Sequence, residues 1–518
     1  MNDDHVGPIY LACHGPDGTL LTRPKGFGPT FASHALSELR SLSNTVEPSM
    51  NLEPTSWRTI LTADVDDDDD DEDGWNGCPV RVHISSPDQA LDLSRRLVAS
   101  ELCEVLYFST DSLEDLVHQV EEGRPIVSNA SGTFSTLDPL VDGFQTWNLG
   151  YHAGWANNDH TTSYKHPTQR EMKTILGRLR EALPNIILRS ANQSRRDLLH
   201  VKTAAEAQLR LALLIFPKND DADATGTYHD VMFAIVVVVG QGAVGKACQE
   251  CHEQRQRQHQ LLLLFGSSPF LTPTRPPLSL LMTNLAGVAP GNVVLDPFCG
   301  SGAMLWGSSY VGAGLCIGSD VIEPGGGGGG STPLYHHYKG AEWLQCDAFR
   351  LSKVLQKHAS KNSSIDGGDY LLDAIVTDPP YGLREDQSRP DDRCPNDKRT
   401  LENHNASTNA GHAKSICYIE DYTGEELLQS VSLMMRPVLE LAVQHLRPDG
   451  GRLVYLLPLI PSQEEMGLWG TTGAFGPDAL DRLPSLPGLV VLSAERHRCK
   501  KRGMARAIIV MERRSNVF

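Results

Sequence analysis

The chain lacks the features of several protein classes. None of its apolar runs approaches the roughly 18 residues that a membrane-spanning helix needs, and residues 1–5 are too acidic and polar for a signal or transit peptide. Its 11 cysteines are odd in number and show neither disulfide-framework nor four-ligand zinc spacing. We therefore expect a cytoplasmic protein with free thiols, no membrane contact and no metal site of its own.

Positive charge is also scarce. The 518 residues include 46 Lys and Arg against 64 Asp and Glu, which gives a net charge of -18. This balance excludes a protein that coats DNA through its overall charge, so binding to nucleic acid would require a local basic face or a partner. Hydrophobic residues make up 40% of the chain and charged residues 21%, which is typical of globular domains with a packed core.

Three stretches of low complexity or high polarity interrupt the globular pattern. An acidic block lies within residues 64–73, a run of six glycines lies within residues 323–332, and residues 386–415 are rich in Asp, Asn, Arg and Pro. Their mutually repelling charges, flexible glycines and turn-forming residues predict disordered or flexible loops. We interpret all three as surface insertions, because the entropy cost of closing a loop rises only slowly with its length.

The rest of the chain reads as an α+β part followed by an α/β part. Residues 80–122 alternate strand, helix, strand and helix, with Ser112 in the cap of the last helix, and a helix from Gln169 is expected to end at Pro184. From about residue 269 strands alternate with helices, which implies parallel strands joined by crossover helices. The strands expected there are Val293–Leu295, Leu315–Gly318, Ala374–Thr377, Arg452–Leu456, Leu489–Leu492 and Ala507–Met511.

The strongest chemical signal is Asp378-Pro379-Pro380-Tyr381, directly after the expected strand Ala374–Thr377. The exocyclic amino group of a nucleobase is a poor nucleophile because its lone pair is delocalised into the ring. The Asp378 carboxylate and the Pro379 carbonyl could accept its two hydrogens and free that lone pair, while the two prolines fix the backbone. Tyr381 would stack on a base taken out of its stack. The motif therefore predicts chemistry on a nucleobase amino group.

A second signal lies upstream, at Val293–Gly302. Asp296 ends a strand, and Phe298, Gly300 and Gly302 belong to the turn that follows, where glycines let a ligand approach the backbone. The turn lacks the full G-x-G-x-x-G pattern, so a pyrophosphate is not its expected ligand.

Two further aspartates lie downstream, Asp320 at the end of the next predicted strand and Asp347 within Gln345–Ala348. Asp320 could hold ribose hydroxyls, and Asp347 could accept a hydrogen bond from an adenine amino group. Each alone is equally typical of a turn or a helix cap. Together with Asp296 and the Asp378 motif, they predict a pocket for S-adenosylmethionine beside a base pocket.

Residues 240–252 carry three motifs that compete with this interpretation. Gly240–Gly245 matches a dinucleotide-binding fingerprint and Gly240–Lys246 resembles a P-loop, but Ala247 stands where a P-loop has Ser or Thr. Cys248–His252 has the spacing of a covalent haem site, which would require export to an oxidising compartment. No acidic strand end follows about 20 residues later, so we interpret the region as a glycine-rich turn between a strand and a helix.

A basic cluster stands out near the C-terminus of this acidic chain. Its members are Arg496, Arg498, Lys500, Lys501, Arg502 and Arg506. Two interpretations remain open, namely a solvated loop between the last two strands and a contact with nucleic-acid phosphates.

The two main motifs together resemble the tRNA (guanine-10-N2)-methyltransferases, specifically the catalytic subunit of the eukaryotic two-component enzyme. The similarity is sharpest at residues 296–302 and 373–385, where the continuation Tyr381–Glu385 is more diagnostic than the four-residue motif shared by many amino-methyltransferases. Weaker similarity covers most of residues 80–514. Residues 272–278 depart from the family's Thr-Ser-x-Asp-type segment because they lack its acidic residue.

This resemblance implies an α/β fold, with a Rossmann-like S-adenosylmethionine-dependent methyltransferase domain at 263–518. An N-terminal α+β domain at 1–110 and a THUMP-like RNA-binding region at 111–262 would precede it. The resemblance also implies S-adenosylmethionine as cofactor, tRNA as substrate and a small zinc-binding subunit as activating partner. The side chains expected to contact RNA are Arg384, Arg498, Lys500, Lys501 and Arg502.

The sequence thus favours methyl transfer to the exocyclic N2 of a guanine in tRNA. The alternatives are adenine-N6 methylation of DNA or RNA, another tRNA guanine, and a non-catalytic RNA-binding subunit. The four-residue motif does not separate these targets, whereas Arg384–Glu385 and the THUMP-like region favour tRNA.

Overall fold

The computed structural model of the chain describes residues 10–14, 20–21, 29–46, 80–82, 84, 86–109, 112–123, 146–153, 167–190, 199–202, 207–217, 231–264, 274–321, 338–359, 371–380, 424–459, 483, 485–498 and 505–515. The three stretches expected as insertions, 64–73, 323–332 and 386–415, lie outside these residues.

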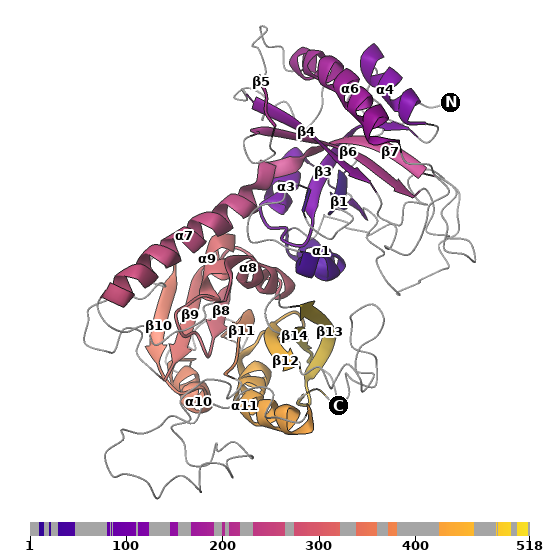
Figure 1. The fold of residues 1–518 in the computed structure, drawn as a ribbon. Coiled ribbons are helices and arrows are strands. Elements are labelled where there is room, and N and C mark those ends of the chain that lie inside the picture. The colour runs from indigo at the N-terminus through magenta and orange to yellow at the C-terminus, as the bar shows by residue number, and fades with distance from the viewer. Residues whose placement is uncertain are drawn as a thin grey trace, which may run out of the picture. The chain divides into compact units, whose positions relative to one another are not determined.

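The chain forms two compact units, 1–251 and 252–518, and helix α7 (Ala243–Leu264) contains the boundary between them (Figure 1). Each unit is built on a sheet of seven described strands. The expected division into three domains at 110 and 262 stays a prediction, although strands from the first two of these domains share one sheet. Among the helices of the described segments, none is long and apolar enough to cross a membrane.

The first unit combines a mostly antiparallel sheet with helices. Its strands are β1 (Tyr10–Cys13), β2 (Val80–Val82), β3 (Glu101–Ser109), β4 (Thr146–Ala153), β5 (Leu199–His200), β6 (Leu209–Pro217) and β7 (Val231–Val238). Their order is β2-β1-β3-β7-β6-β4-β5, in which β4 runs parallel to both neighbours and the other described pairs are antiparallel. The helices are η1 (Pro29–His34), α1 (Ala35–Val46), α3 (Pro87–Ser94), α4 (Leu113–Glu122), α6 (Gln169–Ser190) and η2 (Val239–Gly242).

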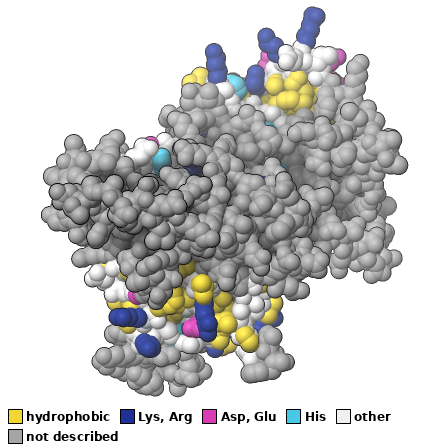
Figure 2. Space-filling model, turned by 60° about the horizontal axis from the view of Figure 1, so that its bottom comes forward, with side chains coloured by type: hydrophobic (Ala, Val, Ile, Leu, Met, Phe, Trp, Pro, Cys, Tyr) yellow, Lys and Arg dark blue, Asp and Glu magenta, His cyan; other side chains and the backbone are white. Residues whose placement is uncertain are grey.

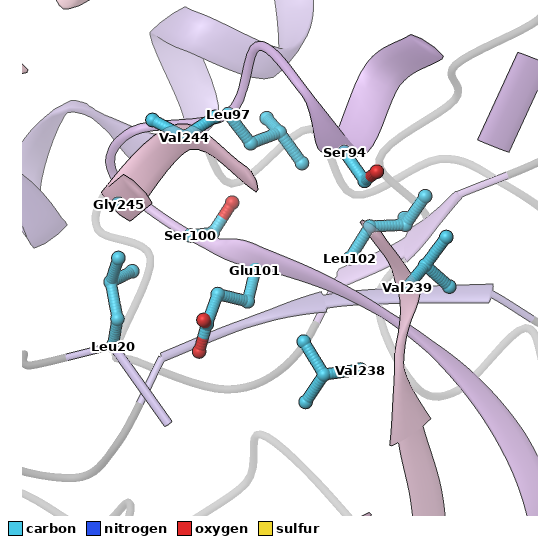
Figure 3. Close-up of a pocket in the computed structure, with 10 residues that line it drawn as sticks. All are labelled: Leu20, Ser94, Leu97, Ser100, Glu101, Leu102, Val238, Val239, Val244 and Gly245. Carbon is cyan, nitrogen blue, oxygen red and sulfur yellow. The ribbon is translucent and has the colours of Figure 1, made fainter. Parts of the chain in front are cut away.

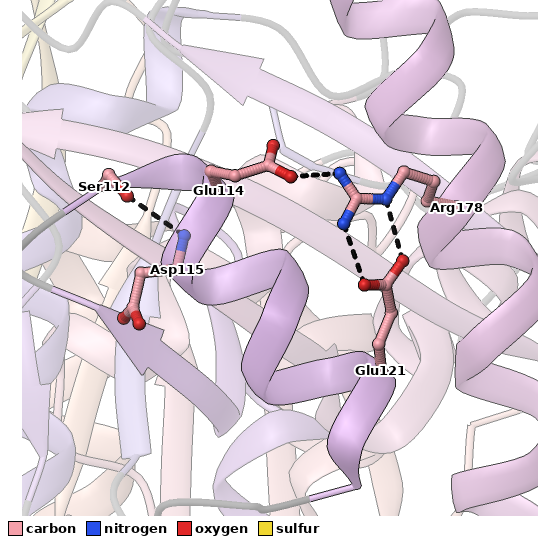
Figure 4. Close-up of polar contacts among 5 residues, drawn as sticks. All are labelled: Ser112, Glu114, Asp115, Glu121 and Arg178. Carbon is pink, nitrogen blue, oxygen red and sulfur yellow. Dashed lines mark hydrogen bonds and ion pairs between the residues drawn. The ribbon is translucent and has the colours of Figure 1, made fainter.

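Helices α4 and α6 pack together on this sheet and are joined at the surface by Arg178 (Figure 4). The Arg178 guanidinium pairs with Glu121 at 2.7 and 2.8 Å and also with Glu114. Ser112 caps α4 by accepting a hydrogen bond from the Asp115 N–H at 3.0 Å, which confirms the predicted cap. These exposed contacts dock one helix on the other and add little stability beyond the core beneath them.

The predicted end of the second of these helices is wrong, because α6 continues through Pro184 to Ser190. A proline inside a helix removes one hydrogen bond and crowds the preceding turn, at a cost of roughly 3 kcal/mol. Leu179 and Leu183 are buried in the core just before the proline, and this packing holds the helix in place.

The second unit is a doubly wound α/β domain. Its strands are β8 (Val293–Asp296), β9 (Leu315–Asp320), β10 (Ala341–Gln345), β11 (Ala374–Thr377), β12 (Arg452–Leu459), β13 (Leu489–Arg498) and β14 (Ala505–Arg513). In the order β10-β9-β8-β11-β12-β14-β13, the first five strands are parallel and β14 is antiparallel to both neighbours. The strand order reverses between β8 and β11, which is the Rossmann-like arrangement and confirms the predicted α/β class.

The helices of this unit flank the sheet, and one of them, α8, holds the segment that follows β8. They are α8 (Pro276–Leu285), α9 (Leu305–Val311), α10 (Ala348–Ala359) and α11 (Gly424–His445). Every residue of α8 is buried, and its Ser279 Oγ donates to the Met304 carbonyl at 2.8 Å. Gly307 of α9 allows the close approach, since a Cβ there would lie 2.7 Å from the Ser279 carbonyl oxygen.

In the first unit, Glu38 of α1 is a fully buried carboxylate that holds the turn before β3. Its oxygens accept hydrogen bonds from Val98 N at 3.1 Å and Ala99 N at 2.9 Å. Arg96 is also buried, and burial lowers the pKa of its guanidinium to about 10 although the Glu38 charge acts in the opposite direction. The backbone donors and the arginine offset the hydration that the carboxylate loses.

We expect Glu38→Ala to lower the free energy of unfolding of this unit by roughly 2–4 kcal/mol, because it orphans buried N–H groups and removes the charge beside Arg96. Urea unfolding of the full chain followed by circular dichroism measures the loss. The control Asp92→Ala removes an exposed ion pair with Arg95 and should cost less than about 1 kcal/mol. Equal losses in the two variants would contradict the role of Glu38.

Candidate active site

The functional residues expected in the second unit gather at one edge of its sheet. Asp296 and Asp320 close β8 and β9, and Asp347 and Asp378 follow β10 and β11 within two residues. Because these strands are parallel, their carboxyl ends share one edge, where open α/β sheets bind ligands. The structure thus brings together four aspartates that are far apart in the sequence.

The loop after β8 lies tightly over the end of β9. The N–H groups of Cys299 and Gly300 donate to the Ser319 carbonyl and to Asp320 Oδ2, both at 2.9 Å. Gly300 and Gly302 have φ angles of 48° and 80°, a region that favours glycine. Asp320 therefore fixes the glycine turn with one carboxylate oxygen, in addition to the ligand contact expected of it.

Asp296 lies at the centre of this edge with 1% of its surface exposed. Its Oδ1 accepts hydrogen bonds from Thr377 Oγ1 at 2.7 Å and Phe298 N at 3.1 Å, whereas its buried Oδ2 has no partner among the described residues. Burial and, to a lesser degree, the charges of Asp320 and Asp378 raise the pKa of this carboxyl to about 7. A buried acceptor of this kind suits a ligand that brings a donor or a positive charge.

The apolar side of the site is visible only in the structure. Val321 and Phe349 follow Asp320 and Asp347 by one and two residues, and they expose 57% and 47% of their surface. The Cys346 N–H donates to the Asp320 carbonyl at 2.9 Å, so the ends of β9 and β10 are adjacent. Exposed apolar side chains beside carboxylates suit a flat heteroaromatic ring. Sequence patterns do not identify them, because exposure of a hydrophobic residue depends on its neighbours in space.

Asp347 also has a local structural role. Its Oδ1 accepts a hydrogen bond from the Phe349 N–H at 3.0 Å, at the first turn of α10. This is the helix-cap contact that the sequence allows as an alternative to adenine binding.

The Asp378 carboxylate is held by two side chains from distant parts of the chain. Its Oδ2 accepts a hydrogen bond from Thr274 Oγ1 at 3.1 Å and pairs with Arg506 Nη1 at 3.2 Å. Thr274 precedes α8, and Arg506 lies near the start of β14. Arg506 belongs to the basic cluster in the sequence, and no role was expected of Thr274, because no local pattern indicates a contact across more than 100 residues.

The rest of the two motifs is only partly described. Pro379 is buried and Pro380 half-buried after β11, whereas Tyr381 and Arg384 lie outside the described residues. Arg498 is the last residue of β13. Lys500, Lys501 and Arg502 also lie outside the described residues, so the expected RNA contacts stay predictions.

The glycine-rich segment at 240–252 is a turn and a helix, as interpreted from the sequence. Gly240 has a φ angle of 68°, and a Cβ there would lie 2.0 Å from Ser94 Oγ. The adjoining pocket has room for about one water molecule and is lined mainly by apolar side chains (Figure 3). Cys248 and Cys251 are buried on α7. This described part of the first unit therefore supports the structural turn rather than a nucleotide or haem site.

Comparisons with known proteins agree with the expected resemblance. The family described as RMKL-like, methyltransferase domain, matches residues 269–313. The tRNA (guanine(10)-N(2))-methyltransferase TRMT11 of Mus musculus is 32% identical over 212 residues, which are 37% of this chain and 40% of that protein. The tRNA (guanine(10)-N(2))-methyltransferase of Schizosaccharomyces pombe is 32% identical over 197 residues, which are 37% of this chain and 35% of that protein.

The alignments therefore span about two fifths or less of the length of these curated relatives. Among solved structures, TrmN from Thermus thermophilus aligns with 98% of this chain and 99% of its own, with 16% identity and a TM-score of 0.41. The fold assignment of the second unit rests on its strand order and not on this likeness.

We expect Asp296→Asn to stabilise the ligand-free protein above pH 7 and to have little effect near pH 4. The folded chain keeps a proton on Asp296 up to a pKa of about 7, whereas an unfolded aspartate releases it near pH ~3.9. Stability therefore falls as the pH rises through this window, by on the order of a few kcal/mol. Thermal melting from pH 4 to 8.5 measures the difference, and a constant offset between the two proteins across this range would contradict it.

Proposed function

We propose that the chain is an S-adenosylmethionine-dependent methyltransferase that modifies the exocyclic N2 of a guanine in tRNA, at position 10 as in its relatives. The observation that carries the proposal is the Asp378-Pro379-Pro380 turn, which follows β11 beside the carboxylates that close β8 and β9. The similarity to tRNA (guanine(10)-N(2))-methyltransferases supports guanine in tRNA as the target.

Asp378 and Pro379 act on the amino group of the base. The Asp378 carboxylate and the Pro379 carbonyl each accept one hydrogen, so the nitrogen lone pair turns away from the ring. S-adenosylmethionine, when bound, would supply the methyl group that this lone pair attacks, and the neutral thioether would be the leaving group. The nitrogen loses one proton, and Asp378 is placed to receive it and pass it to water because 21% of its side chain is exposed.

The residues at the strand ends fit the cofactor that this chemistry requires. S-adenosylmethionine supplies an electrophilic methyl group on a positively charged sulfur. The buried oxygen of Asp296 that has no partner among the described residues suits its ammonium group, and Asp320 suits the ribose hydroxyls. Asp347 would accept from the adenine amino group, and Val321 and Phe349 offer apolar faces for its ring.

The RNA and protein partners follow from the resemblance. The first unit would contribute a THUMP-like RNA-binding region, and Arg384, Arg498, Lys500, Lys501 and Arg502 would contact phosphates. Lys and Arg side chains project from the described surface beside hydrophobic ones (Figure 2), which provides local positive charge on an acidic chain. We also propose a small zinc-binding subunit as activator. Within the segments that the structure describes, no group of three or more His, Cys, Asp or Glu is arranged to hold a metal ion.

We expect the chain, co-expressed with this partner, to transfer labelled methyl from S-adenosylmethionine to unmodified tRNA and not to duplex DNA. Nucleoside analysis should identify the product as N2-methylguanosine. Asp378→Ala should fold and bind cofactor but lose transfer by at least about 100-fold, because it removes the amino-group acceptor. Label in DNA alone would point to adenine-N6 methylation, and full activity of the variant would overturn the assigned chemistry.

We expect the affinity for S-adenosylmethionine to fall about 10-fold from pH 8 to pH 6. Protonation of Asp296 below its pKa of about 7 removes the acceptor for the cofactor's ammonium group. Isothermal titration calorimetry measures the change. Asp296→Asn should bind weakly and without this pH dependence, whereas Asp92→Ala, a matched control that removes an exposed carboxylate of the first unit, should follow the wild type. Wild-type affinity that stays constant between these pH values would argue against Asp296 as a cofactor ligand.

A further inference from the structure

Two donors converge on a single oxygen of the proposed amino-group acceptor. Thr274 Oγ1 and Arg506 Nη1 lie 3.1 and 3.2 Å from Asp378 Oδ2. A carboxylate oxygen offers two lone-pair positions, and these donors use both positions on Oδ2. These two donors fix the orientation of the carboxylate, which restricts the side of Asp378 from which the amino group can approach.

We propose that Arg506 and Thr274 are positioning residues for methyl transfer, which hold the Asp378 carboxylate in the orientation that accepts the amino group. This inference rests on the proposed function and deepens it. It assigns to Arg506 a role in the chemical step, in place of the phosphate contact that its basic neighbours in the sequence suggest.

The backbone of Arg506 is well suited to this role. Arg506 lies in β14, where its Cα is paired with Pro458 of β12 on one side and with His497 of β13 on the other. Its side chain is only 25% exposed. Because the backbone of Arg506 is hydrogen-bonded within the sheet between two strands, its side chain starts from a well-defined position. Groups on strands are positioned more accurately than groups on loops.

Thr274 is held in turn by Arg255 of α7. The Arg255 guanidinium donates to the Thr274 carbonyl at 2.6 Å and to the Ala303 carbonyl at 2.9 Å. Arg255 is 6% exposed, and Ala303 directly follows the glycine turn that contains Gly302. All of these residues belong to the second unit. Arg255 thereby connects Thr274, which contacts Asp378, to the loop proposed to bind cofactor. We infer that this connection keeps the proposed amino-group acceptor at a fixed position relative to the methyl donor.

The charge of Arg506 also counters local repulsion. Asp378 lies close enough to Asp296 for its charge to raise the pKa of that buried carboxyl, and Asp320 acts in the same direction. A guanidinium on Asp378 Oδ2 offsets this like-charge repulsion, which would otherwise turn the Asp378 side chain away. A displacement of about 1 Å at a reacting group can slow a reaction by around 100-fold.

The test compares Arg506→Gln, Arg506→Lys and Thr274→Val in the co-expressed full chain. Single-turnover transfer to tRNA at saturating cofactor and tRNA measures the chemical step, while calorimetry and filter binding measure the two affinities. The matched control is Arg436→Gln, which removes another arginine–carboxylate pair, with Glu440, on the exposed face of α11.

The expected result is a rate that falls about 10- to 100-fold in Arg506→Gln and Thr274→Val. Arg506→Lys should retain an intermediate rate, and the affinities for cofactor and tRNA should stay within about twofold of wild type. Arg436→Gln should match the wild type. A purely structural role would instead lower the melting temperature and weaken cofactor binding together.

The opposite pattern would overturn the inference. If Arg506 contacts phosphate, Arg506→Gln weakens tRNA binding and lowers the slope of log affinity against log salt concentration by about one. The transfer rate at saturating cofactor and tRNA then stays unchanged. An unchanged rate in both Arg506→Gln and Thr274→Val, with active wild type, refutes the positioning role alone. No transfer by the wild type to any tRNA would refute the proposed function and this inference with it.

Discussion

The hydrogen bond between Thr377 and Asp296 is the contact on which the geometry of the site depends. It joins the ends of β8 and β11 at 2.7 Å and is completely buried. Thr377 immediately precedes Asp378, so the same bond sets where this proposed amino-group acceptor lies relative to the proposed cofactor pocket. Gly318 supports this frame from β9, because a Cβ there would lie 2.8 Å from Cys299 Sγ in the adjoining loop.

At this edge of the sheet, the carboxylates of the described residues are held by the Arg506 guanidinium and by backbone and hydroxyl donors. Asp296 is buried and accepts two hydrogen bonds. Asp320 accepts one from the Gly300 N–H, and Asp378 pairs with Arg506. Negative charge gathered in this way favours a cationic ligand, and it would repel the phosphates of RNA. A methyl donor with a positive sulfur suits such an edge, whereas tRNA would have to be held by groups elsewhere on the chain.

Much of the fold was predictable from local patterns. Six strands of the second unit contain the predicted ranges, because β-branched and aliphatic runs bounded by turn residues are strong signals for buried strands. Strand β14 departs from the expected parallel arrangement, since it is antiparallel to both neighbours. The edge strand β10 was missed, since Ala341–Gln345 is only partly buried and has no such run. The end of α6 was misplaced because packing of Leu183 in the core outweighs the local effect of Pro184.

Residue order alone was enough to predict the candidate site, because an Asp-Pro-Pro segment and aspartates near the ends of strands are local features. The side chains that surround these residues became known from the folded structure. Thr274 and Arg506 contact Asp378 although they lie 104 and 128 positions away in the sequence. The exposure of Phe349 likewise depends on which residues surround it in space. Hydrogen bonds, ion pairs and burial act over a few ångströms in space, and separation along the chain carries no information about such distances until the sheet has formed.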